Sequence, residues 1–378
     1  MVSELNFGWR TALLGLAALQ ILALAVALAC QPTQATANRL LAAALLAIVG
    51  MLTPYVIGFA GAYDLWPGLT FAPFAISLAI GPLLFAYAHS MGDGRLPHRL
   101  PWHLAPAAAQ VCYFGVCFLL PSDLKWDWYT GGHRQWVAPG MELLTIASLA
   151  AYVWAIHRVL GRYRLRLKAE RSDDDRYAAR WLSQVLGAIV CGLAAHLGFW
   201  LWSVAAGGIN YFQELGLYLG LAAIGLYLGA AGWRHAHLPP ALLAPPTPAS
   251  VEAHGAGGRD WAAVAVDLAD RTRRLELWRD PELSLTQAAR ALGTNSGRLS
   301  RALNLGLGLN FSEFINGLRA EGVAEALRLH PHADLLRLGL DMGYSSKASF
   351  NRSFRSRFGM TPSEYRRRVS NPAFPPAG

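Results

Sequence analysis

Charged residues are scarce in this sequence and are missing from long stretches of it. Asp, Glu, Lys and Arg make up 15% of the 378 residues, whereas 54% are hydrophobic; an average soluble domain has about 25% charged residues. The composition therefore excludes a disordered chain and an ordinary soluble protein. The length predicts two or more domains.

Cysteine is scarce as well, and several common catalytic motifs are absent. The four cysteines all lie inside apolar runs, where a thiol usually packs as a small hydrophobic group. We therefore expect no disulfide and no metal site. The sequence contains no Walker glycine loop, no HExxH, no GxSxG and no histidine-kinase ATP site. We expect neither enzymatic activity nor a cofactor.

The missing charges define seven long apolar runs in residues 1–235. Six runs contain no Asp, Glu, Lys or Arg, and the run 135–157 contains only Glu142. The six are residues 11–38, 40–63, 65–92, 100–122, 181–213 and 215–233. About 20 apolar residues cross a bilayer as a helix, and a charge at its centre costs about 2.5–3.5 kcal/mol. The runs predict a bundle of seven transmembrane helices.

The basic residues between these runs predict the orientation of the bundle, because Lys and Arg stay preferentially in the cytoplasm. With the C-terminus inside, the inner segments carry Arg39, Arg95, Arg99, eight basic residues in 158–180, and Arg234. The outer segments carry only Arg10, Lys125 and Arg134. We therefore expect a multi-pass protein of the bacterial inner membrane, with its N-terminus outside and its C-terminal half in the cytoplasm.

A few residues of the membrane half are candidates for a sensor. Trp126, Trp128 and His133 lie between the fourth and fifth runs, where they would hold a small ligand or simply belong to an interfacial aromatic belt. His196 lies in the middle of the sixth run, where an ionisable residue marks a functional site or a hydrogen bond to a neighbouring helix. We interpret the three Asp residues 173–175 as the N-terminal cap of the sixth helix.

The composition changes abruptly after the last apolar run. Residues 239–258 contain five Pro and three Gly, which is typical of a linker. We divide the chain into a membrane domain (1–235), a linker (236–258), a DNA-binding domain (259–370) and a disordered tail (371–378). Residues 259–370 carry 18 basic and 12 acidic residues, a difference of +6 out of the net charge of +9, which suits an anionic partner.

The C-terminal domain contains a duplicated helix-turn-helix pattern. Its periodicity and its stop signals predict helices at 260–279, 285–292, 296–305, 311–329, 334–341, 346–358 and 362–368. In the first copy a small residue, a turn glycine and an apolar residue stand at Ala289, Gly293 and Leu299. Gly339, Gly343 and Ser349 have the same spacing in the second copy, so the fold class is all-α with a double helix-turn-helix after the membrane bundle.

Helical periodicity then predicts which side chains face DNA. Leu299 and Leu303 should be buried in the first copy, and Phe350, Phe354 and Phe358 in the second. The predicted DNA-binding residues are Ser296, Arg298, Ser300, Arg301 and Asn304 in the first helix-turn-helix, and Ser345, Lys347, Ser349, Arg352 and Arg355 in the second. Ser356 should also face outward. Since Arg pairs bidentately with guanine, we predict base contacts for Arg301 and Arg352.

The stretch from about Leu283 to Arg366 resembles the DNA-binding domain of the AraC/XylS family of transcription regulators. The segment MGYSSKASFNRSFRSRFGMTPSEYRR carries the signature at Gly343, Tyr344, Phe350, Arg352, Phe354, Phe358, Gly359, Thr361, Pro362 and Tyr365. The resemblance implies two helix-turn-helix subdomains joined by a long helix, with Arg319 at the family's linker arginine, that engage two successive major grooves. The chain departs from the family at Leu303 and Asn304, usually Phe and Lys, and at Gly339, usually Ala.

Together these features predict a membrane-embedded, sequence-specific transcription regulator that acts as a one-component sensor. The alternative is a membrane receptor or transporter whose helical C-terminal module binds a protein. The expected partners are double-stranded promoter DNA, the lipid bilayer and RNA polymerase. A second copy of the chain and an unidentified small-molecule or membrane stimulus are further candidates.

Overall fold

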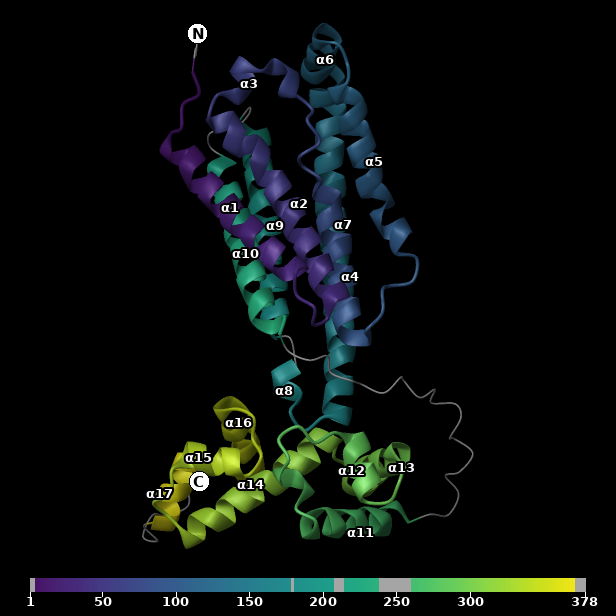
Figure 1. Cartoon of the computed structure of the whole chain (residues 1–378), viewed down its shortest axis with the longest axis vertical. Coiled ribbons are helices and arrows are strands. Elements are labelled where there is room, and N and C mark those ends of the chain that lie inside the picture. Colours follow the sequence, from purple (N-terminus) through teal and green to yellow (C-terminus); the bar gives the residue numbers. More distant parts are fainter. Residues whose placement is uncertain (1–3, 178–179, 207–213, 238–259, 371–378) are drawn as a thin grey trace. The chain divides into compact units, whose positions relative to one another are not determined.

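The computed structural model describes residues 4–177, 180–206, 214–237 and 260–370 and divides the chain into two compact units. Unit 1 comprises Met1–Gly161 and Ala179–Pro240, and unit 2 comprises Arg162–Ala178 and Ala241–Gly378. The described residues form helices, with an isolated β-bridge between Arg171 and Ser284 as the one strand-like pairing among them (Figure 1). This confirms the prediction of an all-α fold. The predicted linker, apart from residues 236 and 237, and the predicted tail lie outside the described residues.

Unit 1 is a bundle of long apolar helices. Its helices are α1 (Trp9–Ala29), α2 (Ala35–Phe59), α3 (Ala62–Leu65), α4 (Ile80–Asp93), α5 (Leu100–Phe118), α6 (Ser122–Trp128), α7 (Ala138–Glu170, up to Gly161 in this unit), α9 (Arg180–Ala206) and α10 (Leu215–His235). Leu14, Leu41 and Leu45 are fully buried in its core. Among the described residues, five helical stretches are long and apolar enough to cross a membrane: Trp9–Ala29, Ala35–Phe59, Ser122–Glu170, Arg180–Gly198 and Leu215–His235.

The apolar run of residues 65–92, which was predicted to hold one of the seven transmembrane helices, is not helical over its whole length. This run forms two short 3-10 turns, Pro67–Leu69 and Ser77–Ala79, and then α4, which has 14 residues. Pro67 and Pro73 supply no backbone N–H donor, and Phe71 has a positive φ of 68°, so the first half of the run cannot continue as a helix. α4 is therefore shorter than the roughly 20 residues that span a bilayer. The count of seven transmembrane helices stays a prediction.

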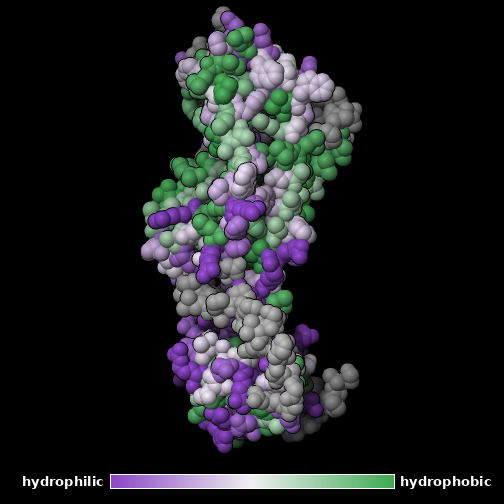
Figure 2. All heavy atoms as spheres, turned by 90° about the vertical axis from the view of Figure 1, so that its right-hand side faces the viewer, coloured by the Kyte–Doolittle hydropathy of each residue, from purple (hydrophilic) through white to green (hydrophobic). Residues whose placement is uncertain are grey.

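The surface of unit 1 is unusually apolar. Large side chains such as Leu19 (62% exposed), Trp154 (62%) and Trp202 (69%) face outward. Hydrophobic residues cover broad areas of the unit 1 helices in the space-filling view (Figure 2). An exposed apolar surface of this extent is typical of contact with lipid or with another protein.

Unit 2 contains the helices expected from the sequence. They are α11 (Trp261–Arg274), α12 (Leu285–Ala291), α13 (Ser296–Arg301), α14 (Phe311–Leu329), α15 (Leu335–Asp341), α16 (Lys347–Phe358) and α17 (Pro362–Ser370). α13 continues as a π-helical turn over Ala302–Leu307. The predicted positions are confirmed, except that the first helix ends at Arg274 and a 3-10 turn, Leu277–Arg279, follows.

The long helix α14 joins two small hydrophobic cores. Its first half contributes Phe314 and Ile315 to the core of the first subdomain, and its second half contributes Val323 and Leu327 to the core of the second. A capping box fixes its start, because Asn310 accepts from the backbone N–H of Glu313 and Glu313 accepts from that of Asn310. One rigid element therefore carries both subdomains.

Unit 2 also includes a segment from between the fifth and sixth predicted spans. It consists of the end of α7 from Arg162 onward and of α8 (Asp174–Tyr177). Asp173 forms an ion pair with Arg171 at 2.7 Å and Asp174 accepts a hydrogen bond from Ser312 Oγ at 2.8 Å. The structure describes α8 from Asp174 and α9 from Arg180, so the interpretation of these Asp residues as the N-terminal cap of the sixth helix stays a prediction.

Candidate nucleic-acid interface

The pairs α12–α13 and α15–α16 each form a helix-turn-helix. The turn glycines Gly293 and Gly343 have positive φ values of 66° and 87°, which glycine adopts without strain. Ala289 and Leu299 are buried in the first pair, and Gly339 is buried in the second. The predicted duplication is therefore confirmed at the level of backbone geometry.

Gly339 lies directly against the ring of Phe350 in the second pair. A Cβ atom placed on Gly339 would lie 2.9 Å from Phe350 Cδ1, which is closer than real Cβ contacts allow. Phe350 is itself 2% exposed and packs against Tyr344. The phenylalanine ring occupies the space that an alanine methyl would need.

The first candidate DNA-contacting helix presents its predicted residues to different degrees. Arg298 and Asn304 are exposed, and Asn304 Nδ2 donates to Ser300 Oγ at 3.3 Å. Ser296 and Ser300 are half-buried. Arg301 is also half-buried, with its guanidinium 5.6 Å from the ring centre of Trp261. Leu299 and Leu303 are buried, as predicted.

The second helix presents Ser345, Lys347, Arg352 and Arg355 to solvent, together with Ser356. Phe350 and Phe354 are buried and Phe358 packs against them, as predicted. The prediction that Ser349 faces outward is wrong. Ser349 is 7% exposed and donates to the backbone oxygen of Ser346 at 2.9 Å. It occupies the position of Leu299 in the first copy, the inner angle between the two helices.

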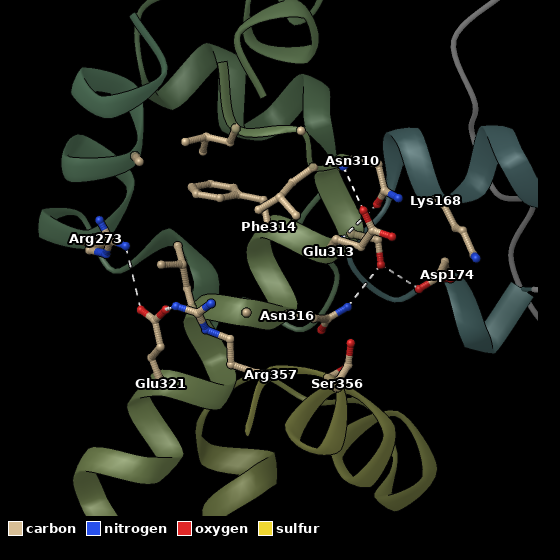
Figure 3. Close-up of a pocket in the computed structure, with 18 of the residues that line it drawn as sticks. Lys168, Asp174, Arg273, Asn310, Glu313, Phe314, Asn316, Glu321, Ser356 and Arg357 are labelled. Carbon is tan, nitrogen blue, oxygen red and sulfur yellow. Dashed lines mark hydrogen bonds and ion pairs between the residues drawn. The ribbon is translucent and has the colours of Figure 1, made fainter. Parts of the chain in front are cut away.

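A cavity of about 930 Å³ adjoins the exposed face of α16. Arg352 and Ser356 line it from α16, the first turns of α14 line it from a second side, and Lys168 and Asp174 line it from a third (Figure 3). Beside it, Glu321 pairs with Arg357 at 2.6 Å and with Arg273 at 3.7 Å. These two solvent-exposed ion pairs connect α11, α14 and α16 at the cavity.

Arg319, the predicted linker arginine, is a buried structural residue. It is 1% exposed and donates to the backbone oxygens of Trp278 at 2.7 Å and Asp280 at 2.6 Å. It also donates to Asn316 Oδ1 at 3.0 Å and to Ser172 Oγ at 3.1 Å. Burial lowers the pKa of Arg319 to about 10, which leaves the guanidinium protonated at neutral pH.

Two polar clusters of unit 1 contain the predicted sensor residues. His196 Nε2 lies 2.7 Å from Glu142 Oε1. The histidine in the middle of the sixth run therefore contacts the single acidic residue of the run 135–157. In the second cluster the hydroxyl of Tyr113 accepts from Trp128 Nε1 at 2.9 Å and contacts His133 Nδ1 at 2.8 Å. Trp126 is 55% exposed and stacks on Tyr129.

Glu142 was not predicted as the partner of His196. The isolated charge in an apolar run was a usable signal, but nothing in the sequence paired the two residues. The described residues contain no group of three or more His, Cys, Asp or Glu side chains placed to hold a metal ion.

Residues 288–368 match a protein family described as a helix-turn-helix domain, of the AraC type. The matched stretch is 81 of the 378 residues of the chain. The match runs from the middle of α12 into α17, and lies outside unit 1 and the segment 162–178. No curated protein and no solved structure matches the chain.

Proposed function

We propose that the chain is a membrane-embedded, sequence-specific transcription regulator that couples a stimulus at its membrane helices to promoter binding. The observation that carries the proposal is the placement of two helix-turn-helix pairs on one long helix, α14, with exposed basic residues on each candidate DNA-contacting helix. Such a pair suits two successive major grooves on one face of the duplex. The net positive charge of the domain would favour association with DNA in a salt-dependent way.

The basic side chains divide into two proposed roles. Arg352 is exposed in the middle of α16, where an arginine is placed to pair with a guanine edge. Arg301 has the corresponding role in the first subdomain, where its guanidinium lies over the ring of Trp261. Lys347, Arg298, Ser345 and the remaining predicted contacts would hold phosphates and fix the register.

The membrane assignment rests on the apolar helices of unit 1 and on their exposed hydrophobic side chains. Lys and Arg prefer the cytoplasmic side of a membrane. The basic residues of the connections therefore support a DNA-binding domain inside the cell, where promoters are present. A stimulus would act by shifting the population of DNA-competent molecules, with no phosphorelay. RNA polymerase and a second copy of the chain belong to the same proposal as partners.

Arg352→Ala and Arg301→Ala test the DNA-binding part of this proposal. Full-length protein in nanodiscs is first used to capture genomic fragments, and its affinity for a recovered fragment is then measured by fluorescence anisotropy. Each variant should lose about 10- to 100-fold in affinity and should relax base preference at one position, because a bidentate arginine–guanine pair contributes about 1–3 kcal/mol.

Arg328→Ala is the matched control for these variants, since Arg328 is an exposed arginine at the far end of α14. It should change affinity little and leave base preference intact. Retention of the full base preference by both Arg352→Ala and Arg301→Ala would refute the assigned contacts. Failure of the wild-type chain to enrich any fragment would favour a membrane receptor whose C-terminal module binds a protein.

Glu142→Gln tests the sensor part. The substitution keeps a hydrogen-bonding group beside His196 and removes the negative charge of the pair. We expect the output of a reporter gene under the captured promoter to shift by about fivefold or more, at equal amounts of protein in the membrane, as for an ordinary allosteric coupling. Asp123→Asn, at an exposed residue of α6, is the control. An unchanged reporter would assign His196 and Glu142 to packing alone, and Trp126, Trp128 and His133 would remain the proposed ligand site.

A further inference from the structure

The loop between α7 and α9 is docked onto the DNA-binding domain through buried polar contacts. Ser172 is 3% exposed, and its backbone N–H and Oγ both donate to the backbone oxygen of Leu283, at 3.2 and 2.9 Å. Its backbone oxygen accepts from Asn316 Nδ2 at 3.0 Å, and its Oγ accepts from Arg319. One residue of the loop therefore bonds the start of the first helix-turn-helix and the middle of α14.

The residues around Ser172 strengthen this docking. Arg171 pairs with the side chain of Asp173, which is fully buried, and its guanidinium lies 4.7 Å from the ring centre of Tyr177. Burying a charged pair is costly unless its partners are in place. Such a segment has one well-defined position on the domain. Residues 171–174 are hereafter called the docked segment.

Asp174 places a carboxylate where a phosphate of DNA would be attracted. It accepts a hydrogen bond from Ser312, in the first turn of α14, and the positive end of a helix dipole favours anions there. Asp174 also lines the cavity that Arg352 and Ser356 line from α16 (Figure 3). A carboxylate in this position would repel a phosphate that approached α16 through this cavity.

We propose that the docked segment is an intrachain ligand of the DNA-binding domain that competes with DNA. This proposal rests on the proposed function and names its regulation: the docked chain binds DNA weakly, and release of the segment raises the affinity. The segment is joined covalently to α7 on one side and leads to α9 on the other, so a rearrangement of those helices acts on it directly. The occupant of the surface formed by Leu283, Ser312, Asn316 and Arg319 is thus the chain's own loop.

A reversible cross-link tests the competition directly. Asp174→Cys and Ser312→Cys are combined in a full-length chain whose four native cysteines are replaced, and the affinity for a captured promoter fragment is measured in nanodiscs before and after reduction. The two native side chains meet at 2.8 Å, so cysteines at these positions would lie close to each other, and formation of the disulfide is checked by mass spectrometry. The oxidised protein should bind at least about fivefold more weakly than the same protein after reduction.

Asp174→Asn separates the charge from the docking. Asparagine still accepts a hydrogen bond from Ser312, and the substitution leaves Lys168, a basic residue lining the same cavity, unchanged. Affinity for the promoter should rise, and the rise should shrink as salt increases. Glu325→Gln, at an exposed acidic residue of α14 outside the cavity, is the control and should have little effect.

The outcomes distinguish this proposal from the proposed function. Equal affinity of the oxidised and reduced proteins, or tighter binding when oxidised, overturns the competition while leaving DNA binding established. Absence of promoter binding in both forms and in the wild-type chain overturns the proposed function itself.

Discussion

Replacement of Arg319 by alanine should destabilise unit 2 by about 3 kcal/mol or more. The substitution leaves the backbone oxygens of Trp278 and Asp280, and the polar atoms of Asn316 and Ser172, without their buried donor. Each buried polar group left unpaired costs about 1–3 kcal/mol. The free energy of unfolding is measured by pulse proteolysis of the full-length protein in detergent across a urea series, which follows the population of unfolded unit 2.

Two further substitutions on α14 make this measurement specific. Arg319→Lys keeps the charge but loses the fork of donors, so it should fall between wild type and alanine. Arg328→Ala removes an exposed arginine and should change stability by about 0.5 kcal/mol at most. If Arg319→Ala were no more destabilising than Arg328→Ala, the buried hydrogen bonds of Arg319 would not be stabilising unit 2.

Gly343→Ala should have the second large effect, on the second helix-turn-helix. Gly343 has a φ of 87°, and an added Cβ would lie 2.6 Å from the backbone oxygen of Arg279 and 2.8 Å from that of Trp278. The left-handed conformation alone costs a non-glycine residue about 1–2 kcal/mol. The collision with backbone atoms, which cannot rotate away, adds to it and should displace the turn that joins α15 to α16.

Gly359→Ala is the matched control, because Gly359 has a φ of 73° but no atom within 4 Å of an added Cβ. It should show the conformational cost without the collision. In the same urea series Gly343→Ala should be at least about 1 kcal/mol less stable than Gly359→Ala. Equal losses would mean that the turn can move away from the first subdomain at no cost.

Part of this molecule could be predicted from local sequence patterns. The absence of charges in long runs predicted the apolar helices, because a buried charge is costly in any apolar surrounding. The turn glycines Gly293 and Gly343 are each followed by a helix cap and by apolar residues at helical spacing. This pattern predicted both helix-turn-helix pairs and the burial of Leu299 and Phe350. Each of these signals lies within about one helix and one turn.

Two expectations differ from the structure because local signals conflicted. Residues 65–92 lack charge, yet their prolines and the backbone at Phe71 divide the run, so the charge-free length did not become one helix. Ser349 was expected outside because helical periodicity put Phe350, Phe354 and Phe358 on the buried side, although its spacing from Gly343 matched that of the buried Leu299. Its local hydrogen bond to Ser346 satisfies the hydroxyl inside the angle between the helices.

Helical periods, turn residues and charge-free lengths were determined by the sequence alone, since each depends on residues within a few positions of one another. The tertiary structure decided which distant polar groups meet: Glu142 with His196, and Ser172 with Arg319 across 147 positions. Those pairings depend on how whole helices pack, because a buried donor takes whichever acceptor the fold brings within hydrogen-bond distance.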